Sequence, residues 1–102
     1  MNFNDLCYNL LRKVPKGKVT TYKSIAQAMK TKAYRAVGNA MNKNPYAPEV
    51  PCHRVINSNG KLGGYAYGLK KKIQMLKTEG VEIKNNKIDL NKYEHKFSKQ
   101  NI

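Results

Sequence analysis

The residues with the clearest chemical potential are three consecutive polar side chains, Cys52, His53 and Arg54, at the end of a proline-rich loop. A cysteine reacts through its thiolate, and a neighbouring base and positive charge favour that form. Consecutive side chains on an extended backbone point to opposite faces, so His53 is not expected to touch the sulfur. A bridging water would then carry the proton, with Glu79 as partner of the imidazole if the last long helix folds back. The alternative is a buried cysteine beside a surface histidine and arginine.

The other cysteine, Cys7, lies in a different setting. Its apolar neighbours recur at helical spacing, which predicts a small buried side chain; they are Phe3, Leu6, Leu10, Leu11 and Val14. The residues that could bind zinc form no CxxC or HxxxH pair, and they are Cys7, Cys52, His53 and His95. We therefore expect no metal ion.

The opening segment does not resemble a signal peptide, because Asp5, Arg12 and Lys13 interrupt its apolar residues. No stretch approaches the length of a membrane span. We therefore expect a soluble, cytoplasmic protein, in which the two cysteines do not form a disulfide.

The charge of the chain is strongly positive. Its 102 residues include 20 Lys and Arg against 6 Asp and Glu, a formal net charge of +14, and every charged residue between Asp5 and Glu49 is basic. Such a surface attracts polyanions through phosphate contacts and counterion release. The alternative is that the lysines only solvate the surface. Charge therefore indicates a nucleic-acid partner without establishing one.

Local patterns predict a mostly α-helical fold with a small β hairpin or wing, in a single domain over residues 1–102. Helices are expected at about residues 4–13, 22–29, 33–43 and 69–79. The second is capped by Thr21, follows a short extended piece at residues 18–20, and is joined to the third by a brief turn at residues 30–32. Two short helices so connected form a candidate helix-turn-helix, a signal that also occurs in domains that never bind DNA.

The second half of the chain is expected to contain less regular structure. Residues 45–51 should form a loop, residues 55–65 a small hairpin or wing, and residues 81–90 a marginal hairpin, with a frayed tail after Tyr93. In the helix at residues 69–79, we expect Leu69, Ile73 and Leu76 to face the core and Gly80 to end the helix.

The stretch from Val50 to Ile56, Val-Pro-Cys-His-Arg-Val-Ile, resembles the signature of the O6-alkylguanine-DNA alkyltransferases. Further segments are similar to the family's pattern in the same order, and together they cover about residues 3–81. They are Pro15-Lys16-Gly17-Lys18-Val19, Thr21-Tyr22, Tyr34-Arg35-Ala36-Val37-Gly38-Asn39-Ala40, Asn44-Pro45, Gly60, Gly63, Tyr65, Gly68-Leu69 and Glu79-Gly80. The resemblance implies the winged helix-turn-helix-like C-terminal domain of that family.

The resemblance also implies how DNA is handled. In the family the helix-turn-helix enters the minor groove, and an arginine on its second helix takes the place of an extruded nucleotide; Arg35 matches that arginine. A base inside a duplex hides its O6 atom, so chemistry on it requires extrusion. A planar guanidinium suits the gap, because it can stack and hydrogen-bond at once. Asn44 matches the residue that braces the helix-turn-helix against the active-site loop.

The chemistry implied by the resemblance is a single alkyl transfer. Cys52 would accept the alkyl group, and His53 would remove its proton through a water and Glu79. Tyr22 would contact the guanine and help to protonate the leaving base, whose negative charge needs a proton donor. The thioether that forms has no easy route back to a thiol, so each molecule should react once.

The same resemblance assigns the binding of the base edge to Tyr65, to the backbone N–H of Ala66 and to the carbonyls of Cys52 and Val55. It implies no cofactor, a monomer, and a partner that is double-stranded DNA containing O6-alkylguanine.

Three features depart from the family's pattern. The turn at residues 30–32 is one residue shorter than is common and lacks the usual glycine. Tyr34 and Asn39 stand where small residues often let the helix lie deep in the minor groove, and Tyr67 stands where many members have glycine.

Two other functions are consistent with parts of the sequence. A non-catalytic alkyltransferase-like protein would flip and hold damaged guanine as a signal, but another residue, often tryptophan, replaces the cysteine in such proteins. A helix-turn-helix transcriptional regulator would need base-reading side chains on the second helix. Ala36, Gly38 and Ala40 supply few of those, and Cys52 argues for the alkyltransferase.

Overall fold

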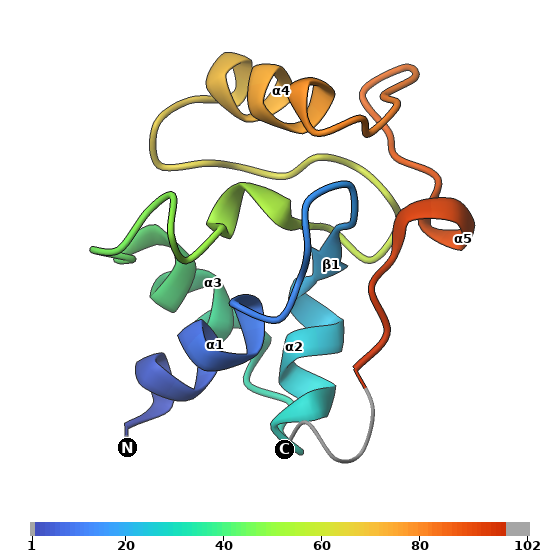
Figure 1. The fold of residues 1–102 in the computed structure, drawn as a ribbon. Coiled ribbons are helices and arrows are strands. Elements are labelled where there is room, and N and C mark those ends of the chain that lie inside the picture. The colour runs from blue at the N-terminus through green and yellow to red at the C-terminus, as the bar shows by residue number, and fades with distance from the viewer. Residues whose placement is uncertain (1, 98–102) are drawn as a thin grey trace.

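Three short helices form one side of the molecule. The computed structural model describes residues 2–97, and in it α1 (Phe3–Leu11), α2 (Tyr22–Ala28) and α3 (Tyr34–Asn42) pack against one another below the centre of Figure 1. Their apolar faces share one core with Cys7, whose predicted burial is confirmed because it is fully enclosed. In the part of the chain that the structure describes, no helix is long and apolar enough to cross a membrane.

Helix α2 begins and ends on local hydrogen bonds. The Thr21 side chain accepts a hydrogen bond from the Ser24 backbone N–H at 2.9 Å, which confirms the predicted cap. At the other end, Thr31 N–H donates to the Ala26 carbonyl, and Lys30 N–H donates to the Gln27 carbonyl. This pairing is a Schellman motif. Lys30 has a φ of 59°, so a lysine occupies the left-handed position that glycine ordinarily takes.

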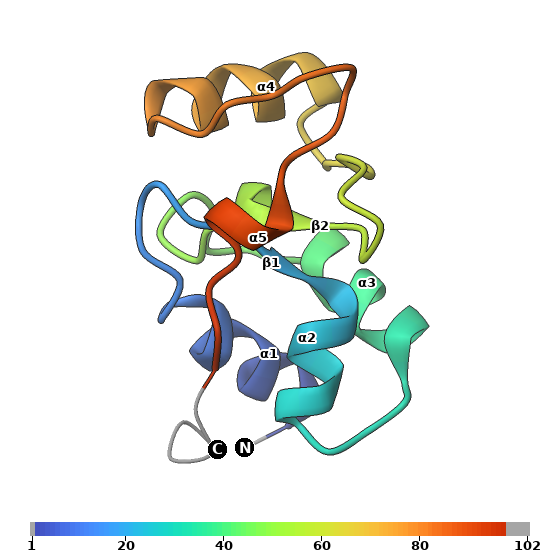
Figure 2. The ribbon, with the colours of Figure 1, turned by 90° about the vertical axis from the view of Figure 1, so that its right-hand side faces the viewer.

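A small parallel sheet lies between this layer and the last long helix. Strand β1 (Thr20–Thr21) pairs with β2 (Val55–Ile56), with Thr20 opposite Val55, and Figure 2 shows both strands between α4 and the three helices. The fold class, mostly helical with a small β element, is thereby confirmed, but the predicted strand partner is wrong. Residues 57–60 do turn, and Asn57 N–H donates to the Lys61 carbonyl at 2.9 Å, but β2 pairs with β1 and Lys61 forms its bridge with Lys87.

Helix α4 (Leu69–Thr78) covers the opposite side of the sheet from α1, α2 and α3 (Figures 1 and 2). The predicted stop at Gly80 is confirmed: its φ is 91°, and Val81 N–H donates to the Leu76 carbonyl. Leu76 is fully buried as expected, but Leu69 is 43% exposed and Lys72 is fully buried in its place. The prediction for Leu69 is wrong because the helix presents its Lys72 flank to the interior.

The C-terminal segment runs back along the sheet. Lys84 and Lys87 exchange backbone hydrogen bonds around Asn85 and Asn86, which confirms a minimal hairpin there, and α5 (Leu90–Tyr93) follows. Residues 94–97 are not frayed, contrary to the prediction, since His95 N–H donates to the Val19 carbonyl at 2.7 Å. The rest of the expected tail, residues 98–102, lies outside the described residues.

Candidate active site

Cys52 is the first residue of a short 3-10 turn, η1 (Cys52–Arg54), between the proline-rich loop and β2. Its backbone N–H donates to the Val50 carbonyl at 2.8 Å, and Arg54 N–H donates to the Pro51 carbonyl at 2.9 Å. The backbone here is therefore turned, and the prediction of an extended backbone, with Cys52 and His53 on opposite faces, is wrong. The Cys52 residue is only 5% exposed, so a reacting group must pass below the protein surface to reach it.

Asn44 ties the end of α3 to the loop that carries Cys52. Its Nδ2 donates to the Val50 carbonyl at 2.7 Å, and its Oδ1 accepts from the Tyr46 backbone N–H at 2.9 Å. The side chain is buried and uses both ends of its amide. This is the position at which the resemblance expects a brace between the helix-turn-helix and the active-site loop.

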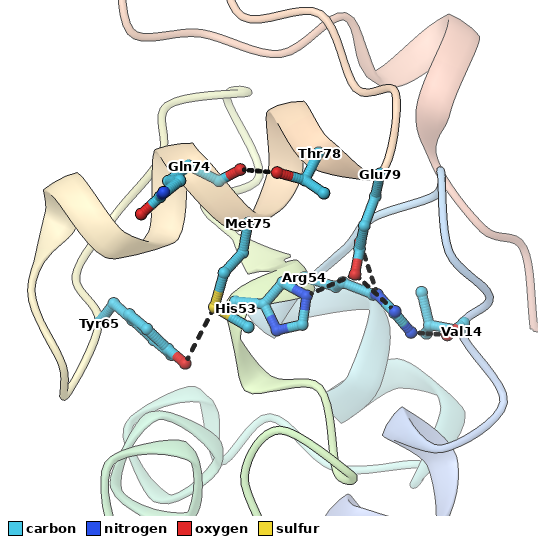
Figure 3. A network of polar contacts seen from close by, with 8 residues as sticks. All are labelled: Val14, His53, Arg54, Tyr65, Gln74, Met75, Thr78 and Glu79. Carbon is cyan, nitrogen blue, oxygen red and sulfur yellow. Dashed lines mark hydrogen bonds and ion pairs between the residues drawn. The ribbon is translucent and has the colours of Figure 1, made fainter.

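A carboxylate from the end of α4 joins the two residues that follow Cys52 (Figure 3). Glu79 Oε2 lies 2.9 Å from His53 Nε2, and Arg54 donates to both Glu79 oxygens, from Nε at 2.9 Å and from Nη2 at 2.7 Å. Arg54 Nη1 also donates to the Val14 carbonyl at 2.7 Å, beyond the end of α1. The Arg54 charge, which we had expected to favour a thiolate, is thus paired with Glu79 and ties three segments together.

The network selects one form of the imidazole. Burial works to raise the pKa of Glu79, but hydrogen bonds from Arg54 and His53 outweigh it and lower that pKa, so Glu79 is a carboxylate. Burial lowers the pKa of His53, which keeps the ring neutral at neutral pH. Because the carboxylate accepts only, Nε2 carries the proton and Nδ1 keeps its lone pair. His53 Nδ1 is buried and has no hydrogen-bond partner among residues 2–97, so it is free to accept a proton.

Two tyrosines border the cysteine. Burial, with the neighbouring Cys52 as the next cause, raises the pKa of Tyr22 and raises that of Tyr65 to about 12. Both phenols therefore remain protonated at neutral pH and can donate hydrogen bonds. Tyr65 stands edge-on to His53, with ring centroids 6.4 Å apart, and its hydroxyl reaches Met75 Sδ at 3.7 Å (Figure 3). Tyr22 and Tyr65 both pack against the core cluster that contains Cys52.

Lys72 is the functional candidate that the sequence reasoning missed. Its Nζ donates to three backbone carbonyls, those of Val55 at 2.7 Å, Leu62 at 2.6 Å and Gly64 at 3.0 Å. Burial lowers its pKa to about 8, while the neighbouring Cys52 opposes that shift. The only sequence signal is position: Lys72 is four residues before Leu76 and shares its helix face. Because Lys72 is one of three consecutive lysines, its residue type alone does not distinguish it from Lys70 and Lys71.

The remaining base-edge residues are split between the interior and the surface. Val55 is fully buried, and its carbonyl already accepts from Lys72. A carbonyl has a second lone pair, so this contact leaves one acceptor position. Ala66 is exposed in the turn at residues 65–68, which Gly68 N–H closes onto the Tyr65 carbonyl at 3.0 Å.

Arg35 lies apart from Cys52, in an open groove of about 690 Å³ on the helix-turn-helix side. The groove is lined by residues of α2, of α3 and of the turn after β2, namely Tyr22, Lys23, Tyr34, Arg35, Gly38, Asn57, Ser58 and Asn59. Its lining contains two cations and no acid. Tyr22 belongs both to this groove and to the packing around Cys52, so it connects the two parts of the site.

Cys7, the second cysteine, is buried in the core that α1, α2 and α3 share. Burial raises the pKa of Cys7 to about 11, so its thiol is not ionised at neutral pH. Residues 2–97 contain no group of three or more His, Cys, Asp or Glu side chains that could hold a metal ion.

Comparison with known proteins identifies relatives of this chain in both sequence and fold. Residues 2–81 match the model of the 6-O-methylguanine DNA methyltransferase, DNA binding domain. The methylated-DNA--protein-cysteine methyltransferase of Methanosarcina acetivorans is 52% identical over 79 residues, which are 76% of this chain and 51% of that protein. The chain thus spans about half the length of the curated methyltransferases it matches.

Two solved structures resemble the fold closely. Mycobacterium tuberculosis OGT in complex with DNA superposes with a TM-score of 0.75 at 40% identity, covering 78% of this chain and 49% of that one. S. pombe Atl1, in complex with damaged DNA containing O6-carboxymethylguanine, superposes with a TM-score of 0.80 at 33% identity, covering 95% of this chain and 100% of that one. By its sequence and its fold, this chain belongs to the 6-O-methylguanine DNA methyltransferase family.

Proposed function

We propose that this protein repairs DNA by transferring the alkyl group of O6-alkylguanine from duplex DNA to Cys52, once per molecule. The observation that carries the proposal is the buried Nδ1 of His53, which has no hydrogen-bond partner among residues 2–97. His53 follows Cys52 in the chain, and the other ring nitrogen lies 2.9 Å from the Glu79 carboxylate. A neutral imidazole held in this way is a base suited to activating a thiol.

The proposed reaction balances without a cofactor. His53 Nδ1 takes the Cys52 proton, through a bridging water where the two groups do not touch, and the thiolate attacks the alkyl carbon. A sulfur–carbon bond forms as the bond between that carbon and guanine O6 breaks. The departing guanine carries the electron pair of the broken bond and takes up one proton, assisted by Tyr22, whose raised pKa keeps its hydroxyl a donor. The proton that His53 took from the thiol returns through solvent to the group that protonated guanine. The products are a thioether on Cys52 and guanine.

The groove beside Arg35 is the proposed entry for DNA. Lys23 and Arg35 supply positive charge to it without an opposing acid. Arg35 is exposed on α3, where a guanidinium can enter the space left by an extruded nucleotide. That the OGT and Atl1 structures contain DNA supports duplex DNA as the partner.

A sensing role is the second candidate function. The likeness to Atl1 over the whole of that chain supports it, since a protein of this fold could hold damaged guanine as a signal without reacting. The presence of Cys52, next to His53 in the same backbone turn, favours transfer.

Mass spectrometry of the intact protein distinguishes the two functions. After incubation with a duplex containing O6-methylguanine, transfer predicts a mass gain of one methylene, which peptide mapping should locate on Cys52. The matched control is an unmodified duplex of the same sequence. Tight binding to the damaged duplex with no mass gain would replace the transfer proposal with the sensing role.

A further inference from the structure

Tyr34 is a large aromatic side chain placed where DNA is proposed to lie. It is the first residue of α3, it is 42% exposed, and it lines the same groove as its neighbour Arg35. In the part of the chain that the structure describes, its hydroxyl has no hydrogen-bond partner. Single exposed aromatic residues are ordinary on protein surfaces. Its place in a cationic groove requires a more specific explanation.

Helix α3 cannot withdraw this ring into the protein. Its other face is fixed by Val37 and Ala40, which are fully buried, and the Tyr8 hydroxyl donates to the Ala40 carbonyl at 2.8 Å. One turn after Tyr34, a Cβ added to Gly38 would meet no other atom within 4 Å. Tyr34 and Arg35 therefore line the groove from a helix whose other face is packed into the core, with open space beside them at Gly38.

A duplex docked on this groove leaves little room for a ring at position 34. The minor groove of B-DNA is about 6 Å wide, narrower than a helix with its side chains, so a helix docked there must already widen the groove and leaves no space for an aromatic side chain at its flank. Apolar and aromatic side chains that enter the minor groove do so by inserting at a base step and unstacking it. Extrusion of a nucleotide has already opened one such step, so insertion costs least there.

We propose that Tyr34 is a second DNA-contacting side chain, whose ring stacks on the base pair bordering the gap that Arg35 fills. The inference rests on the proposed function, because it requires a duplex with an extruded nucleotide in this groove. Duplex DNA is chosen over an acidic protein because the lining combines Lys23 and Arg35 with two tyrosine rings, which suits phosphates together with base faces.

Photocrosslinking tests the stacking directly. A duplex carries O6-methylguanine with 5-iododeoxyuridine at the neighbouring position, and it is bound by Cys52→Ala so that no transfer occurs. Irradiation should link the iodouracil to the peptide containing Tyr34. Tyr34→Phe in the same background keeps the ring and should still crosslink, whereas Tyr34→Ala should not. A crosslink at another residue, unaltered by Tyr34→Ala, would overturn the inference.

Affinity provides the second measurement. Loss of one stacked base should weaken binding of the damaged duplex by about ten-fold in Tyr34→Ala, with Tyr34→Phe close to the parent protein. Tyr46→Ala is the matched control, since Tyr46 is 47% exposed but lies outside the groove lining. Tighter binding by Tyr34→Ala would show that Tyr34 obstructs the duplex, and unchanged binding would show that Tyr34 does not contact it; either result would overturn the inference.

The two proposals fail in different ways. A Tyr34 crosslink without any methyl transfer to Cys52 in the parent protein would remove the transfer proposal and keep the stacking. Transfer with no effect of Tyr34→Ala on crosslinking or affinity would remove the stacking alone. A protein that binds no damaged duplex would overturn both.

Discussion

His53 and Glu79 are 26 residues apart in the chain, yet the imidazole Nε2 lies 2.9 Å from the carboxylate Oε2. The contact joins the turn that begins at Cys52 to the last residue of the α4 region, and the Schellman motif at Gly80 determines where Glu79 is held. Because Nε2 donates its hydrogen bond to the Glu79 carboxylate, only Nδ1 of the His53 ring can act as a base.

We expect His53→Gln to slow methyl transfer by about 100-fold, because the thiolate must then form without a general base. Burial lowers the pKa of His53, so wild-type activity should persist below the ordinary value of 6.5 and fall only as pH drops through the lower pKa. The variant's rate should instead keep rising at alkaline pH, as unassisted ionisation proceeds. Single-turnover transfer rates across pH measure both effects.

Glu79→Gln should also slow methyl transfer, because a glutamine side chain no longer holds the His53 imidazole with Nδ1 as the proton acceptor. It also leaves the buried Arg54 without its anion, so folding must be checked by circular dichroism. His95→Gln changes the chain's other histidine, which lies against Val19, and serves as the control. Rates and pH profiles that match wild type in His53→Gln and Glu79→Gln would remove the relay from the mechanism.

The two cysteines should separate reactivity from stability. Cys52→Ala should abolish transfer and leave affinity for the damaged duplex nearly intact, because a buried sulfur contributes little to phosphate contacts. Cys7→Ala should lower the free energy of unfolding by roughly 1–2 kcal/mol through lost core packing and leave transfer nearly unchanged. Intact mass and urea unfolding measure the two properties. Methylation that persists in Cys52→Ala would identify another acceptor.

Arg35→Ala should slow repair of O6-methylguanine in duplex DNA much more than reaction with free O6-benzylguanine, because the free base has no stack to leave. The lost charge also weakens binding, so rates are compared at saturating protein. Equal slowing of both substrates would mean that Arg35 supports the fold or the pocket instead of base extrusion.

Lys72→Met should lower the free energy of unfolding at pH 7 by about 3 kcal/mol, because three carbonyls, two of them in the buried residues Val55 and Leu62, lose their donor and this outweighs removal of a buried charge. Lys71→Met, at an exposed position one residue earlier, is the matched control and should change stability little. If Lys72→Met does not change the free energy of unfolding, the three carbonyl contacts make no net contribution to stability.

The pH dependence of the same variant follows from the Lys72 pKa. Burial lowers that pKa from 10.5 to about 8, so between these values the unfolded chain binds more protons at this group than the folded protein. The contribution of this pKa shift is fully present above pH 10.5 and is lost as pH falls through about 8. The stability difference between wild type and Lys72→Met should therefore widen from pH 8 to pH 10 in urea titrations, and a constant difference would contradict the shift.

Lys30→Gly should stabilise the protein by about 1 kcal/mol, since a residue with a side chain is strained in the left-handed conformation and glycine is not. The φ of 59° at Lys30 is the basis of this expectation. Lys32→Gly, two residues on and without a positive φ, should not stabilise. Thermal unfolding of the two variants at equal ionic strength separates the backbone effect from loss of a positive charge.

The sequence by itself determined the features that depend on neighbours along the chain. The start of α2 follows from Thr21, whose side chain reaches a backbone N–H three residues later, and the end of α4 follows from the conformational freedom of Gly80. Burial of Cys7 follows from apolar residues at helical spacing. The motif around Cys52 indicated the family before any contact was known, because the order of residue types along the chain carries that information.

Only the tertiary structure decided the contacts between segments far apart in the chain. The pairing of Thr20 with Val55 replaced the expected hairpin, because a two-residue strand has too few local hydrogen bonds to select its partner. Likewise, Lys70, Lys71 and Lys72 are chemically identical in sequence, yet only Lys72 is buried. The carbonyls of Val55, Leu62 and Gly64 converge on that one position, and buried acceptors require a donor wherever the fold brings them together.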